Sequence, residues 1–313
     1  MHLRKCSTAT ALALAAMILY LPPARSAAAQ DADEAVAYQA WFAANQAQDT
    51  PKAMEAAAAY LKAFPSGQYA DFLTKWFGPA RLALLNEAIK AGQVDKILSV
   101  GREILASEPE NLNVLYTLAL QLRQRELLAS PRSFAHGADA VEVSRKAIEL
   151  VESGRTLAGV DSFDKDATLA WLYQVVAMVE AEKGDFDKAV ELYGRSSALA
   201  PNDAAIAGRN LLEMLSMRQS RYASAVNAYN ALPEEARGAA EPSAEVADAR
   251  GKLNAEADAL IDVAARFVAF ADARGLPKAT RDRVFSLLEG VYKSRHPDDP
   301  AGLQGLIESK KPS

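Results

Sequence analysis

The chain has 313 residues, of which 50% are hydrophobic, 24% charged and 7% aromatic. This apolar share excludes a largely disordered protein, and the length is sufficient to bury a sizeable core in one or two domains. The formal charge of −5 argues against nucleic acid as a partner, because its negatively charged phosphates bind best to a basic protein surface. One Cys and three His nearly exclude chemistry that needs clusters of either residue.

The first 29 residues have the order of a secretory signal peptide. Two basic residues, Arg4 and Lys5, precede an apolar stretch over 8–21, and small residues stand at Ala27 and Ala29. The apolar stretch has roughly 14 residues, fewer than the roughly 20 that a membrane-spanning helix needs. The sequence therefore predicts cleavage after Ala29 and a periplasmic or secreted protein. The alternative is an uncleaved anchor.

Cleavage would change the charge and remove the single Cys. It would leave 32 basic and 40 acidic residues, a net charge of −8. Because Cys6 precedes the apolar stretch instead of following it, the sequence does not predict a lipoprotein. No later stretch is apolar enough to span a membrane, so we expect no stable span after cleavage. A mature chain without Cys has no disulfides and must be stabilised by its core.

Residues 170–203 form the clearest helical unit. The sequence predicts a helix over 170–182, a turn at Gly184 and a second helix over 186–199 that ends before Pro201. Small and aromatic residues recur in this unit at fixed spacing, and those that carry the pattern are Tyr173, Val176, Ala177, Ala189, Tyr193 and Pro201. The unit resembles a tetratricopeptide repeat (TPR).

Weaker copies of this unit lie on both sides of it. The small residues of the second helices stand at positions 53, 97, 140, 189 and 225. The intervals exceed the roughly 34 residues of the repeat, and three segments account for the longest, 66–77, 127–136 and 153–166. We therefore expect an all-α fold, a right-handed α-solenoid of five TPR-like helix-turn-helix repeats over 30–235. The alternative is an irregular bundle whose Ala-rich helices mimic the period.

The pattern changes after the repeats. Residues 233–244 are interpreted as a linker, and a long amphipathic helix is predicted over 243–274, ending at Gly275. Apolar residues recur in this helix every seven positions, at Val246, Leu253, Leu260 and Phe267. Such a stripe requires a partner to cover it.

Two further helices are predicted at the C-terminus. The first covers 278–294, and Asp299 followed by Pro300 predicts the start of a short last helix. We expect residues 243–313 to cap the solenoid, because stacked repeats need a cap for solubility. The alternative is that 243–294 pairs with a second copy of the chain as a homodimer.

Common enzyme motifs are missing from the sequence. It contains no H-E-x-x-H, G-x-S-x-G or P-loop pattern. Gly154 and Gly159 have the glycine spacing of a P-loop without the residues that follow it, and so a plain loop is predicted. The two His of the mature chain, His136 and His296, are each without a second His or Cys nearby and are interpreted as surface or loop residues. We expect no catalytic residue, no cofactor and no metal site.

The resemblance to tetratricopeptide proteins implies a binding groove, because the first helix of each repeat faces the concave side in that family. Carried over position by position, it implies a groove lined by Tyr38, Phe42, Asn113, Tyr116, Arg123, Trp171, Gln174, Met178, Asn210 and Met214. Aromatic and Met side chains suit contact with a peptide, and Asn, Gln and Arg can pair with its backbone or with a carboxylate. The alternative for each residue is packing between helices.

These features predict an exported, non-catalytic adaptor that binds a peptide or a partner helix in its groove. The partner would be a protein or peptide that the sequence does not identify. A second hypothesis is an all-α hydrolase or glycan-binding protein, which would have carboxylates and aromatic residues in one cleft. A third is a self-associating structural protein. Acids that converge in one pocket would favour the enzyme, whereas a continuous groove would favour the adaptor.

Overall fold

The computed structural model describes residues 27–311, and this part of the chain is all-helical. It contains 13 α-helices, with 78% of the residues in helix and no strand among those described. The predicted signal peptide lies outside this range, apart from its last three residues, which fall in the first helix. None of the described helices is both long and apolar enough to cross a bilayer.

The helices have the following bounds, with two short π-helical segments labelled η. They are α1 (Ala27–Gln46), α2 (Thr50–Ala63), α3 (Ala70–Ala91), α4 (Val94–Ser107), α5 (Leu112–Leu122), η1 (Arg123–Leu127), α6 (Gly137–Glu152), α7 (Lys165–Glu182), α8 (Phe186–Leu199), η2 (Ala204–Gly208), α9 (Arg209–Asn230), α10 (Glu234–Arg237), α11 (Ala244–Arg274), α12 (Lys278–Arg295) and α13 (Gly302–Ser309). The chain divides into two compact units between Asn86 and Glu87, within α3.

The first unit contains the hairpin of α1 and α2. Ala53 and Ala57 of α2 are fully buried, and such small side chains allow the two helices to pack closely. The buried Tyr60 donates its hydroxyl hydrogen to Glu34 of α1 and accepts a hydrogen bond from the backbone N–H of Tyr69 at 3.0 Å. These bonds tie α1 and α2 to the turn before α3.

The α7–α8 hairpin is the unit that carried the repeat pattern. Helix α8 has the predicted bounds, and the turn before it contains Gly184 at a φ of 83°, a left-handed conformation that favours glycine. Asp185 caps α8, since its carboxylate accepts a hydrogen bond from the N–H of Lys188. Ala189 is fully buried and Tyr193 nearly so, as the pattern predicts for a close helix pair.

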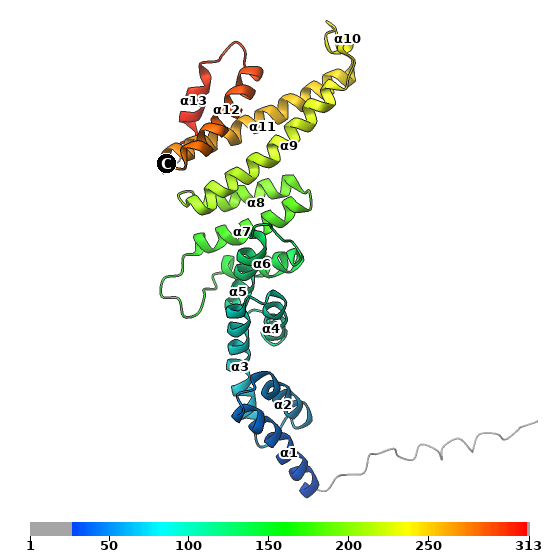
Figure 1. Ribbon diagram of the computed structural model, residues 1–313, viewed down its shortest axis with the longest axis vertical. Coiled ribbons are helices and arrows are strands. Elements are labelled where there is room, and N and C mark those ends of the chain that lie inside the picture. Colours follow the sequence, from blue (N-terminus) through cyan, green and yellow to red (C-terminus); the bar gives the residue numbers. More distant parts are fainter. Residues whose placement is uncertain (1–26, 312–313) are drawn as a thin grey trace, which may run out of the picture. The chain divides into compact units, whose positions relative to one another are not determined.

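Helices that follow one another in the second unit pack on one another. Contacts link α4 with α5, α5 with α6, α6 with α7, α7 with α8 and α8 with α9. Figure 1 shows α9 and α11 side by side, extending past α8 and past α12, with the short α10 at their far end. The predicted linker over 233–244 therefore contains a helix, and it lies at the tip of a helical hairpin.

The C-terminal helices pack together within the second unit. Of the heptad stripe on α11, Val246, Leu260 and Phe267 are buried, and Leu253 is half-buried. Helix α11 contacts both α12 and α13, and it ends at Gly275, whose φ of 63° is left-handed as a helix C-cap requires. The predicted stripe and its end are thus confirmed.

The start of α13 corrects one prediction. The helix begins at Gly302, later than the expected N-cap at Asp299. The Asp299 carboxylate accepts hydrogen bonds from the Gly302 N–H at 3.0 Å and from the Tyr292 hydroxyl at 3.5 Å. These contacts hold Asp299 in a turn, and the helix starts only after it.

Candidate functional site

Five of the ten predicted groove residues are buried. They come from α7 and α9, and they are Trp171, Gln174, Met178, Asn210 and Met214. The cause is that every side chain of α7 from Thr168 to Glu180 is buried, since α6, α8, η1 and η2 all contact this helix. The expectation that these five face a partner is therefore corrected, because they fill the interior between helices.

Three of the predicted residues meet in a chain of hydrogen bonds. Arg123 donates from Nε and Nη2 to Oε1 of Gln174, at 3.1 and 2.6 Å. Gln174 Nε2 donates to Oδ1 of Asn210 at 2.7 Å. Asn210 Nδ2 donates to Oγ of Ser196 at 2.8 Å, and Ser196 Oγ donates to the carbonyl oxygen of Ala170 at 2.6 Å. Every side-chain polar atom of the buried Gln174 and Asn210 thus has a partner, and the chain joins η1, α7, α8 and α9.

The other two predicted residues of the second unit also make contacts within the protein. Asn113 is exposed, yet its amide exchanges two hydrogen bonds with the backbone of Ala158, at 3.0 and 2.9 Å. This pair pins the loop between α6 and α7. Tyr116 is half-buried and meets Trp171 edge to face, with ring centroids 4.8 Å apart. Asn113 and Tyr116 therefore support the fold directly.

The two predicted residues of the first unit belong to an aromatic cluster. Tyr38 stacks on Tyr69 of the turn before α3, with ring centroids 3.7 Å apart. Phe42 remains 39% exposed beside the buried Trp41, and Phe72 of α3 lies edge-on to the same indole at 5.3 Å. Phe42 is the one predicted residue of this unit that offers substantial apolar surface.

His136 contacts two carboxylates, which nothing in the sequence indicated. It lies in the loop before α6, where its Nδ1 is 2.6 Å from Oε1 of Glu126 and its Nε2 is 3.0 Å from Oδ1 of Asp95. Its backbone N–H also donates to Glu126 Oε2 at 3.2 Å. The hydrogen bond to Glu126 raises the pKa of His136, burial opposes this, and Asp95 adds to the rise.

We expect the free energy of unfolding to fall as the pH rises above 6.5, the ordinary pKa of histidine. The pKa of His136 is higher in the folded chain than its ordinary value of 6.5, so its stabilising charge is complete below that value. The contribution is lost as the pH passes through the folded pKa. Urea unfolding across this range should show a decline in the native protein that His136→Gln lacks. Equal slopes in the two proteins would contradict the prediction.

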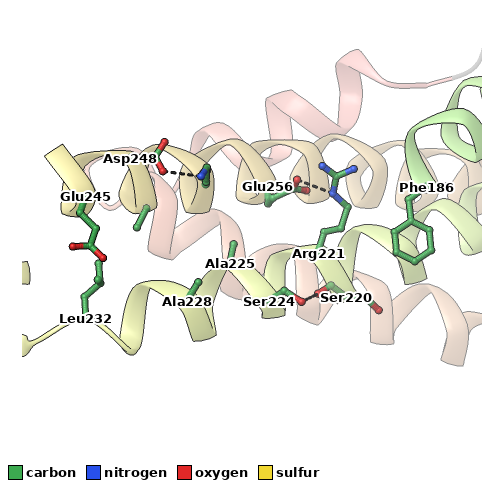
Figure 2. A pocket seen from close by; sticks show the side chains of 12 residues that line it. Phe186, Ser220, Arg221, Ser224, Ala225, Ala228, Leu232, Glu245, Asp248 and Glu256 are labelled. Atoms are coloured by element: carbon green, nitrogen blue, oxygen red, sulfur yellow. Dashed lines mark hydrogen bonds and ion pairs between the residues drawn. The ribbon is translucent and has the colours of Figure 1, made fainter. Parts of the chain in front are cut away.

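An open groove of about 610 Å³ lies between α9 and α11 (Figure 2). Phe186, at the start of α8, lies at one end, and Leu232 lies at the other. Between them the lining contains short side chains, namely Ala225 and Ala228 of α9, Ala249 of α11, and Ser220 and Ser224. Both serine hydroxyls donate to backbone carbonyls one turn earlier in α9, so they present little free polarity to the groove.

The α11 side of the groove is charged. Glu256 accepts a hydrogen bond from Arg221 Nε at 2.8 Å, and Asp248 pairs with Lys252 at 2.7 Å (Figure 2). Glu245 lies at the far end and has no ion pair within the part of the chain that the structure describes. The groove therefore has a nearly neutral middle and an acidic end.

None of the ten predicted residues lines this groove. It exists because α9 and α11 continue beyond α8, so that no residue from Arg218 to Glu245 is buried although most of them are helical. The sequence predicted a separate second helix around Ala225 as part of a fifth repeat, and this is wrong, because α9 runs unbroken from Arg209 to Asn230. The sequence also did not show that α9 would extend past the helix that packs on it.

No protein-family model matches the chain, and no curated protein matches it. Within residues 27–311, no group of three or more His, Cys, Asp or Glu side chains is arranged to hold a metal ion. The function is therefore inferred from the geometry of the chain itself.

Proposed function

We propose that the protein is an exported, non-catalytic adaptor that binds a helix of a partner protein in the α9–α11 groove. The observation that carries this proposal is the uncovered end of the hairpin, where α9 has no buried residue from Arg218 to Asn230 and the adjacent part of α11 has only Val246 buried before Ala257. Export is supported by the signal-peptide pattern of the first 29 residues.

A TPR-like α-solenoid is the architecture that we propose for this adaptor. It is supported by the sequential packing of α4 to α9 and by the match of α7 and α8 to the repeat pattern. Helices α11 to α13 would form its C-terminal cap. Each repeat in such a stack leaves a groove that the next helix fills. The α9–α11 groove would be the one whose outer half stays open for a partner.

The size of the lining side chains favours a helix as the occupant. Helices pack at axial distances of about 8–10 Å, and the shortest distances need small residues at the contact. Ala225 and Ala228 supply such residues on α9, and Ala249 supplies one on α11. An amphipathic helix could insert one ridge of Ala- to Leu-sized side chains between α9 and α11.

The charge of the α9–α11 hairpin indicates which charge the partner helix should carry beside its apolar ridge. Residues 234–256 contain six acidic and three basic side chains. Of the carboxylates in the groove, Asp248 and Glu256 are paired with Lys252 and Arg221, whereas Glu245 is exposed and unpaired among the described residues. A Lys or Arg beside the apolar ridge of the partner would pair with Glu245. The partner is therefore a basic amphipathic helix.

The same ion pairs disfavour the hydrolase hypothesis at this groove. A pair of carboxylates that works as acid and base must face the substrate. Here Asp248 and Glu256 lie on one helix and face Lys252 and Arg221. The groove thus supports binding better than hydrolysis.

Site-specific photo-crosslinking in the cells that make the protein tests the proposal. A photoreactive residue at the groove position Ala228 should crosslink a partner through a helical segment that contains Lys or Arg. The same residue at Ala223, which is exposed on α9 and outside the groove, is the matched control and should give no such product. Glu245→Lys should lower the yield at Ala228. Equal products at both positions, or none at Ala228, would contradict the proposal.

A further inference from the structure

A second cavity lies on the same unit, away from the α9–α11 groove. It is open to solvent, has a volume of about 450 Å³ and is lined by η2, the start of α9, the junction of α11 and α12, and the loop before α6. This volume is in the range of small-molecule sites. Its walls are mainly apolar and include Gly208, Leu212, Phe267, Leu276 and Pro277.

Two arginines line this cavity, and they differ in their partners. Arg132 forms a two-pronged ion pair with Glu213, which neutralises both charges within the wall. Arg209 is exposed and has no carboxylate partner within the part of the chain that the structure describes. The cavity therefore carries one uncompensated positive charge.

A further unpaired guanidinium adds to this positive charge. Arg123 is half-buried and donates to the neutral oxygen of Gln174 instead of a carboxylate. Burial lowers the pKa of Arg123 and the charge of Arg209 lowers it further, whereas Asp203 opposes this effect. The carboxylate of Asp203 accepts the backbone N–H groups that begin η2. The positive charges of Arg123 and Arg209 thus lie near each other. The one acid beside them, Asp203, is already hydrogen-bonded to the backbone.

We infer that this cavity binds a small monocarboxylate that has an apolar body. The guanidinium of Arg209 would hold the carboxylate, because its fork of donors matches two carboxylate oxygens. Leu212 and Leu276, which are both partly exposed, would cover the apolar body. Arg123 would strengthen the attraction through its charge. Such a ligand is chemically distinct from a basic helix, so this site and the α9–α11 groove can be tested separately.

Calorimetric titration of the purified mature chain with octanoate and with octanamide tests the inference. The two probes have the same chain length and differ in charge. We expect octanoate to bind and octanamide to bind at least tenfold more weakly. Arg209→Gln should weaken octanoate about tenfold or more and leave octanamide unchanged. Arg195→Gln, at an exposed arginine of α8 that does not line the cavity, should bind octanoate as the native chain does.

A second variant tests the cavity itself without removing the charge of Arg209. Leu212→Trp places a larger side chain in the wall of the cavity and should block octanoate while Arg209 is retained. Melting temperature and helicity are compared first, so that a folding defect is recognised. Equal binding of both probes, native affinity in Arg209→Gln, or no octanoate binding to the native chain would each overturn the inference.

Discussion

Replacing Phe267 by alanine is expected to lower the free energy of unfolding of the second unit by about 3–5 kcal/mol. Phe267 is fully buried on α11, which contacts α9, α12, α13 and η2. Removing its ring loses buried apolar area and leaves a space that these helices cannot close completely. Urea unfolding followed by far-UV circular dichroism measures the loss.

Phe72→Ala is the matched control for this substitution. Phe72 is 49% exposed on α3, in the first unit, so the same change should cost about 1 kcal/mol or less. A loss in Phe267→Ala no larger than in Phe72→Ala would show that α11 does not form the core described above. Because the chain has two units, each variant is compared over the transition of its own unit.

Asn210→Ala is expected to cost about 2–3 kcal/mol. The substitution removes the group that accepts from Gln174 and donates to Ser196, and so it leaves buried polar atoms without a partner. An unsatisfied buried donor costs more than the net value of the bond that is lost. The measurement is again urea unfolding, with Asn227→Ala, an exposed residue of the same helix, as a control that should lose little stability.

A double-mutant cycle with Gln174→Ala tests whether the two residues act together. If they share the network, the double variant should lose less stability than the two single variants combined, by roughly 1 kcal/mol. Strict additivity would contradict the coupling that the 2.7 Å bond between Gln174 and Asn210 indicates.

The local elements of the fold followed from short-range chemistry. The turn at Gly184, the bounds of α8 and the end of α11 at Gly275 depend on backbone freedom and capping within a few residues. The start of α13 did not follow, because Asp299 is held in a turn partly by Tyr292, a contact that is made only after α12 has formed. The π-helical segments η1 and η2 were also not predicted.

The candidate site was harder to predict than the fold. A residue such as Trp171 has the same repeat position in a groove and in a closed interior, and only the packing of η1 and η2 on α7 distinguishes the two. Conversely, nothing in the sequence distinguishes Ala228 from other small residues in helices. It lines a groove because α9 is longer than α8, and the relative lengths of neighbouring helices are a tertiary property.

The most direct test of the α9–α11 groove is the binding of two designed helical peptides of equal length, followed by fluorescence anisotropy. Both have the same ridge of Ala and Leu, flanked by Lys in one and by Glu in the other. The Lys peptide should bind the native chain at least tenfold more tightly than the Glu peptide. Ala228→Trp should abolish this binding, whereas Ala223→Trp, outside the groove, should preserve it. Equal binding of the two peptides, or native affinity in Ala228→Trp, would contradict the proposed docking of a basic helix between α9 and α11.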